Sequence, residues 1–221
     1  MRKIGPAAVC AALALGVLTG CSSDSGSTDD KSGKDGKGGT AGEAGKNAAV
    51  AAAPKAGQVG GRGTACPLPV EFALAESWKP KAVKPPKEDE PAAFLISQGP
   101  VKLACEIDAK PAGNIGFLRV WTNDNGGTGT KPMELLKSFM ADDKYHRKPE
   151  YRELKAGSLA AAEVSYLNAA PGYEDDPKRE RAFAVVTPKG GVVVHLGGFD
   201  SQEHEEMLPA YELARKTMAA V

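Results

Sequence analysis

Histidines beside carboxylates are the residues of this chain best suited to acid–base or metal chemistry. The sequence has three histidines. His195 lies in the apolar run 192–196, where strand alternation places it on the face opposite Val192, Val194 and Leu196. His204 precedes two glutamates, so a His195/His204 pair with a glutamate would form a general base or a metal site. The segment lacks the second histidine of a zincin helix, and we expect two solvated or rim histidines.

No other motif predicts a metal, a cofactor or a catalytic nucleophile. The segment 123–126 superficially suggests a calcium loop, but Trp121 would then occupy the first ligand position. The chain has no Gly-x-Ser-x-Gly elbow, no Ser-x-x-Lys and no Gly-Lys-Ser/Thr phosphate loop. We therefore expect no metal and no cofactor, and a protein that is not an enzyme.

The first 21 residues have the pattern of an export signal. Met1-Arg2-Lys3 is basic, and the apolar run 7–18 is shorter than the ~20 residues that span a bilayer. Leu18-Thr19-Gly20-Cys21 closely resembles the lipobox of bacterial lipoproteins. That resemblance implies a signal peptide over residues 1–20 and a diacylglyceryl group on Cys21, with palmitate among the acyl chains. The protein would then be lipid-anchored on the extracytoplasmic face of the cell membrane. An ordinary signal peptide with a chance cysteine is the alternative.

The four cysteines separate by position. Cys10 falls in the apolar run and Cys21 in the lipobox, which leaves Cys66 and Cys105 as an even pair. An oxidising compartment favours a disulfide between these two, which closes a loop of about 40 residues. Two buried, reduced thiols are the alternative, whereas a zinc site would need paired spacing and histidine partners that are missing.

The charge balance restricts the partners. Lysines and arginines number 28, as do aspartates and glutamates, so the net charge is zero with neutral histidines. Such a chain has no basic footprint for nucleic acid, and we expect none to bind. The lipid rather than a basic patch must supply the affinity for the membrane.

Composition divides the exported chain into a tether and one domain. From residue 22 to about residue 64 the chain is rich in Ser, Gly, Asp, Lys and Ala and contains no aromatic residue. Such a segment buries too little apolar surface to offset its ordering entropy, so 21–64 is predicted to be the lipidated cysteine and a disordered tether. Residues 65–221 are long enough for one domain with one core.

Apolar periodicity predicts the elements of that domain. Alternation and flanking turn residues predict strands, of which the clearest are 70–74, 101–109, 115–122, 159–167, 181–187 and 192–196. Thr130 is the expected N-cap of one helix, and Asp200 with Glu203 resembles a capping box for a C-terminal helix. The expected fold is α+β, an antiparallel sheet of about six strands packed by two or three helices.

The order of elements resembles a known group. The strand Leu159-Ala160-Ala161-Ala162-Glu163-Val164-Ser165-Tyr166, the hairpin 183–194 and the capped terminal helix are similar to the PsbP-like fold, an α/β/α sandwich. Within that group the chain is similar to small lipid-anchored envelope proteins of the LpqN/LpqT kind, over roughly residues 68–220. The resemblance implies a binding or scaffolding role, as in an extrinsic photosystem subunit or a partner of a small GTPase. It implies no catalytic residues, because the group shares none.

These features favour a membrane-anchored, extracytoplasmic lipoprotein that acts as a non-catalytic binding or adaptor module for an envelope protein. Trp78 and Tyr173 are the aromatic residues predicted to take part in recognition, since aromatic side chains concentrate binding energy at interfaces. A small apolar-ligand carrier is the alternative. A hydrolase that uses His195 or His204 is a third possibility.

Overall fold

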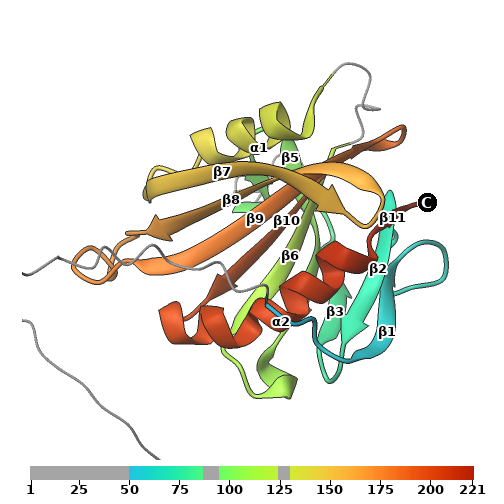
Figure 1. Cartoon of the computed structure of the whole chain (residues 1–221), viewed down its shortest axis with the longest axis horizontal. Coiled ribbons are helices and arrows are strands. Elements are labelled where there is room, and N and C mark those ends of the chain that lie inside the picture. Colours follow the sequence, from blue (N-terminus) through green and yellow to red (C-terminus); the bar gives the residue numbers. More distant parts are fainter. Residues whose placement is uncertain (1–49, 87–94, 124–129) are drawn as a thin grey trace, which may run out of the picture. The chain divides into compact units, whose positions relative to one another are not determined.

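The computed structural model describes residues 50–86, 95–123 and 130–221. All of them belong to one compact unit, Asn47–Val221. In chain order the elements are β1 (Lys55–Gly60), β2 (Val70–Ala75), β3 (Lys79–Ala82), β4 (Ser97–Gln98), β5 (Val101–Asp108), the 3-10 helix η2 (Lys110–Ala112), β6 (Gly116–Thr122), α1 (Pro132–Ala141), β7 (His146–Ala156), β8 (Leu159–Asn168), β9 (Lys178–Thr187), β10 (Gly190–Gly198), α2 (Ser201–Thr217) and β11 (Ala219–Ala220) (Figure 1).

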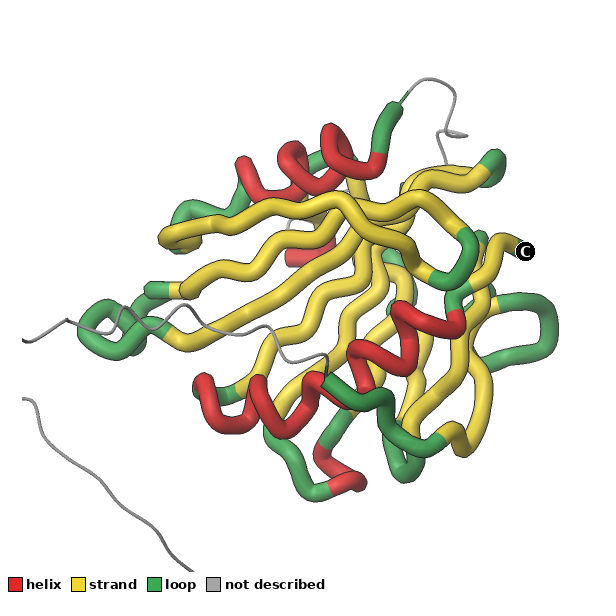
Figure 2. Tube along the Cα trace, viewed as in Figure 1, coloured by secondary structure: helices red, strands yellow, loops and turns green. Residues whose placement is uncertain are grey.

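The strands form two antiparallel sheets. The larger has eight strands in the order β3-β5-β6-β10-β9-β8-β7, with β4 also paired to β5. The smaller has the order β1-β2-β11. Figure 2 shows the long strands of the larger sheet side by side, with one helix on each side of them. The predicted α+β fold with an antiparallel sheet and helices packed on it is confirmed.

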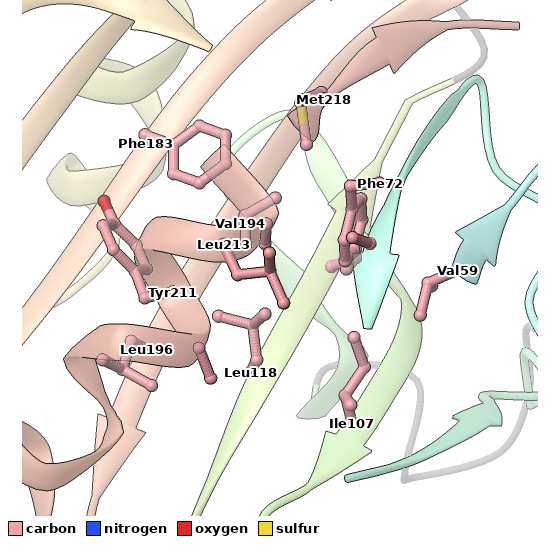
Figure 3. Close-up of a cluster of buried hydrophobic side chains, with 14 of the residues drawn as sticks. Val59, Phe72, Ile107, Leu118, Phe183, Val194, Leu196, Tyr211, Leu213 and Met218 are labelled. Carbon is pink, nitrogen blue, oxygen red and sulfur yellow. The ribbon is translucent and has the colours of Figure 1, made fainter. Parts of the chain in front are cut away.

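Both faces of the larger sheet are covered, which explains the apolar run in β10. Val192, Val194 and Leu196 point into the core beneath α2 and the smaller sheet, whereas Val193 points into the core beneath α1. Every residue of β10 is buried. Figure 3 shows side chains of the α2 core, including Leu196 and Tyr211, packed between that helix and the sheets. A strand buried on both faces has few polar residues, because neither face meets water.

Local chemistry sets the helix starts. The N-cap of α1 is Lys131, one residue after the predicted Thr130, because Pro132 takes the first helical position, where a missing N–H costs nothing. In α2 the Asp200 carboxylate accepts a hydrogen bond from the Glu203 backbone N–H at 2.8 Å, as the sequence predicts.

One turn requires glycine. Gly157, between β7 and β8, has φ +55°, and a Cβ there would lie 1.9 Å from the Met218 carbonyl oxygen. Its N–H donates to the Arg215 carbonyl at 2.8 Å. Glycine alone tolerates both this backbone conformation and this approach, so the β7–β8 turn can hold the end of α2.

The folded part begins earlier than the predicted boundary at residue 65. Residues 55–60 form β1, which pairs with β2, and Val59 is fully buried. Upstream, the Ala53 N–H donates to the Pro209 carbonyl of α2 at 2.9 Å. The composition of this segment predicts disorder because it carries few apolar residues of its own. β2 supplies the missing hydrogen-bond partners, which composition cannot indicate.

The described residues also contain more strands than the six expected. Several of the additional strands are two to four residues long: β3, β4 and β11. Strands this short cannot show an alternating pattern, so periodicity misses them.

Candidate functional site

A buried polar cluster lies on the α1 side of the larger sheet. Strand register brings Tyr166 of β8, Glu180 of β9 and His195 of β10 onto this face. The Tyr166 hydroxyl donates to Glu180 Oε2 at 2.8 Å, and His195 Nε2 lies 3.0 Å from the same oxygen and 3.1 Å from the hydroxyl. Asn168 and Lys178 add contacts to Glu180 at 3.3 and 3.2 Å. We call these five residues the His195 cluster.

The Glu180 carboxyl is ionised within this cluster. Burial by itself would raise its pKa, but the hydrogen bond and positive charge of His195, with the charge of Lys178, outweigh burial and hold the pKa at about 2. Burial and the neighbouring Glu180 charge raise the pKa of Tyr166 well above its usual value, so the phenol stays protonated and donates. The carboxylate is saturated with donors, an arrangement typical of a structural network.

His204 is buried in the first turn of α2. Only 2% of it is exposed, and its Nδ1 has no hydrogen-bond partner within the described parts of the chain. Burial, reinforced by the positive charge of Arg181, lowers its pKa to about 4. His204 is therefore neutral at neutral pH.

Both histidines correct the prediction of solvated or rim side chains. Alternation places His195 on the face opposite Val192, Val194 and Leu196, as predicted, but α1 covers that face, and the Phe139 and His195 ring centroids are 6.2 Å apart. No hydrogen bond joins His195 to His204 among the described residues. His195 has a carboxylate within reach, but it lines neither of the two hollows described below.

Lys178 links the His195 cluster to the surface. Its Nζ donates to the Gly198 carbonyl at 2.8 Å and lies 4.9 Å from the centroid of the Tyr173 ring. Tyr173 belongs to the β8–β9 connection, which Figure 1 places at the same end of the molecule as the first turn of α2. The Arg179 N–H donates to Ser201 Oγ at 3.0 Å across this junction. The two elements enclose a hollow of about 430 Å³ that Tyr173 and Phe199 line together.

Two large apolar side chains are exposed beside this hollow. Ile115 and Phe199 are each 57% exposed, and they are neighbours because the Phe199 N–H donates to the Ile115 carbonyl at 2.8 Å. We call Ile115, Tyr173, Phe199 and the adjoining hollow the Phe199 surface.

A second hollow follows β5 in the region between β3 and β4. Its volume is about 460 Å³, and we call it the β5 groove. Most of its lining is apolar: Pro67, Ala82, Val83, Pro85, Ile96, Pro100, Leu103 and Ala104. The polar residues of the lining are Lys102, Thr122 and Asn123.

A family model described as uncharacterised lipoprotein matches residues 36–218. The chain belongs to this lipoprotein family. Membership confirms the prediction of a lipoprotein and implies association with a membrane. Neither α-helix in the described ranges has the length and apolar character needed to cross a bilayer.

The lipoprotein is similar in fold to solved structures. One of them is the solution structure of cyanobacterial PsbP (CyanoP) from Synechocystis sp. PCC 6803, at 11% sequence identity and a TM-score of 0.47. The match covers 74% of this chain and 97% of that chain. A search of curated proteins finds no match.

The two aromatic residues that the sequence predicts for binding lie in different surroundings. Tyr173 is half-buried at the Phe199 surface, where its ring lines the hollow. Trp78 is only 5% exposed and packs in the core, which corrects its predicted place at an interface. The lipoprotein also contains a disulfide between Cys66 and Cys105, the bridged alternative of the two considered. Cys21 lies outside the described residues.

Sequence reasoning misses Ile115 and Phe199. Phe199 directly precedes the N-cap of α2, a position where an apolar side chain often packs onto the fourth helical residue. That residue here is the buried His204, and Phe199 stays exposed. A histidine in place of an apolar residue at the fourth helical position is therefore the sequence signal that indicates an exposed Phe199.

The arrangement of potential metal ligands is a further feature of the residues that the structure describes. No group of three or more His, Cys, Asp or Glu side chains among them is arranged to hold a metal ion.

Proposed function

We propose that this lipoprotein is a non-catalytic binding module on the extracytoplasmic face of the cell membrane that docks an envelope protein. The lipobox resemblance at Cys21 and the lipoprotein family support the anchor. A diacylglyceryl group on Cys21 would hold the protein stably, since two acyl chains suffice where one is marginal. The Glu180 carboxylate is saturated with donors and lines neither hollow, which supports a non-catalytic role.

The exposure of Ile115 and Phe199 carries the binding role. Both side chains are more than half exposed and adjacent, in a domain whose described strands otherwise bury most large apolar residues. A partner that covers them removes apolar surface from water, worth about 25 cal/mol per Å². Tyr173 adds a ring of the kind that concentrates binding energy at interfaces.

The chain length limits where the partner can lie. Fewer than thirty residues separate Cys21 from Val50, where the described domain begins. A fully extended chain advances at most ~3.6 Å per residue, so the domain stays within ~100 Å of the anchor. The partner is therefore a membrane protein or a protein held near the membrane.

In-cell photo-crosslinking tests this function. With p-benzoylphenylalanine at position 199 or 173, we expect a discrete protein adduct that disappears when Cys21→Ala releases the chain from the membrane. The same label at Leu95, which is 66% exposed, is the matched control and gives no such adduct. Absence of an adduct at both positions, or an identical adduct from Leu95, contradicts the proposal.

The β5 groove favours a second candidate, a carrier of small apolar ligands. Its volume of about 460 Å³ falls in the range of ligand pockets, 300–1,000 Å³, and most of its lining residues are apolar in type. The two cores themselves are filled with packed side chains, so a ligand would lie in this surface groove and not inside the sandwich.

A rim substitution tests the carrier. Ala82 is exposed and lines the groove, so Ala82→Arg places a charged side chain over it without touching the core. We expect the affinity of the Cys21→Ala chain for cis-parinaric acid to fall at least tenfold, as followed by fluorescence. Ala160→Arg, on exposed β8 surface, is the control and leaves the affinity unchanged. Equal affinities of the two variants, or no binding by the parent, would rule the carrier out.

A further inference from the structure

The Phe199 surface is bordered by carboxylates that no cation neutralises. Asp176 and Asp200 line its hollow, and Glu174 and Asp175 are exposed in the same β8–β9 connection. In the described part of the chain none of these four forms an ion pair. The border therefore carries uncompensated negative charge.

Carboxylates of α2 extend this border on the side of Ile115. Glu203 accepts a hydrogen bond from the Ile115 N–H at 2.9 Å, and Glu206 accepts one from the Asn114 side chain at 3.2 Å. Neither has an ion-pair partner within the described ranges. Such hydrogen bonds orient the carboxylates but leave their charge in place.

The two cationic residues that follow this acidic segment, Lys178 and Arg179, already form ion pairs within the domain. Lys178 pairs with Glu180 and donates to the Gly198 carbonyl, and its side chain is only 17% exposed. Arg179 pairs with Glu205 at 2.8 Å. Neither is available to balance the border, so the exposed apolar side chains lie within a field of negative sign.

From this arrangement we propose that the Phe199 surface binds a cationic segment of a protein partner, in which lysines or arginines flank an aromatic or aliphatic anchor. This inference rests on the proposed binding function and specifies the partner's chemistry. The anchor side chain enters the hollow between Tyr173 and Phe199, and the flanking cations meet the carboxylates. Complementary charge of this kind raises the rate of association and excludes partners of the wrong sign.

The same charges argue against other occupants. A second copy of the chain would bring two acidic borders together, because a two-fold interface uses the same patch twice. Residues 22–49 contain four lysines but five acidic residues and no aromatic residue, so the chain's own upstream segment lacks the anchor. Anionic lipid headgroups would be repelled by the border.

A panel of nine-residue peptides tests the proposal with the full mature chain carrying Cys21→Ala. The cationic probe is Lys-Leu-Lys-Phe-Lys-Leu-Lys-Phe-Lys. A second peptide replaces every Lys with Glu, and a third replaces Leu and Phe with Ser. We expect fluorescence anisotropy to detect binding of the first peptide alone, with an affinity that falls at least tenfold from 50 to 500 mM NaCl because salt screens exposed charges.

Substitutions test whether that binding takes place at the Phe199 surface. Phe199→Ser with Ile115→Ser is expected to weaken it at least tenfold, and Asp175→Asn with Asp176→Asn at least threefold with a shallower salt dependence. Leu95→Ser and Glu153→Gln, exposed elsewhere, are the matched controls and leave it unchanged. Circular dichroism of each variant verifies folding.

Three outcomes overturn the inference: equal binding of the Glu peptide, equal loss from Leu95→Ser, or binding to phosphatidylglycerol vesicles that Phe199→Ser abolishes. If any of these occurs while the crosslink at position 199 persists in cells, the binding module stands and only the partner chemistry is wrong. If the crosslink is also absent, the binding function itself fails.

Discussion

Replacing Cys66 and Cys105 with alanine together is expected to lower the free energy of unfolding by about 4 kcal/mol. The bridge joins residues 39 apart in sequence, and in the chain-entropy model its removal frees a loop of that length in the unfolded state. Cys66 lies in the connection between β1 and β2, and Cys105 lies in β5, so the bond ties the smaller sheet to the larger one. Both residues are buried, which protects the bond from reductants in the folded state.

Urea unfolding with and without dithiothreitol measures this effect. Reductant is expected to destabilise the parent protein by a similar amount and to leave the double variant unchanged. A loss of about 4 kcal/mol is a large part of the 5–15 kcal/mol that holds a typical domain folded. A parent whose unfolding midpoint is the same with and without reductant would contradict the prediction.

The second large effect is a loss of stability as the pH falls from about 6.5 to about 4. His204 has a folded-state pKa of about 4, below the value of 6.5 for an unfolded histidine. Between these values the unfolded chain binds a proton that the folded chain does not, so lowering the pH favours unfolding. Stability is complete above pH 6.5, and about 3 kcal/mol is lost by pH 4.

Chemical denaturation at a series of pH values separates His204 from other groups. His204→Gln is expected to remove most of the slope between pH 6.5 and 4, whereas His146→Gln, at the start of β7, retains it. Glu180 acts in a different window. Its folded pKa of about 2 lies below 4.5, so its contribution is complete above pH 4.5 and is lost as the pH falls toward 2. An unchanged slope in His204→Gln would show that its burial does not control acid stability.

Sequence reasoning correctly predicts features that depend on a single residue or on the periodicity of a single strand. Alternation in β10 places His195 on the correct face, and the Asp200 cap follows from residue types three positions apart. It fails for features that depend on contact with an element distant in sequence. α1 covers His195, and the core encloses Trp78, although neither contact leaves a local signal. β1 likewise exists because β2 pairs with it.

The same limit applies to the candidate site. Tyr173 stands out in sequence because an aromatic residue within a turn-rich, acidic segment is unusual. Ile115 directly precedes β6 and Phe199 directly follows β10, and the backbone hydrogen bond between them joins their side chains into one apolar surface. The sequence contains the carboxylates of its border, but their common sign at one end of the sheet depends on how the β8–β9 connection meets α2.

The position of the disulfide has a mechanical consequence. A pull on the chain upstream of Val50 first strains the Ala53–Pro209 hydrogen bond and the pairing of β1 with β2. At Cys66 the tension crosses the sulfur–sulfur bond into β5, which is hydrogen-bonded to β6 within the larger sheet. Residues 67–104 are thereby bypassed. Even if β1 is stripped away, only about 16 residues can be drawn out, an extension of ~55 Å, before the larger sheet takes the load.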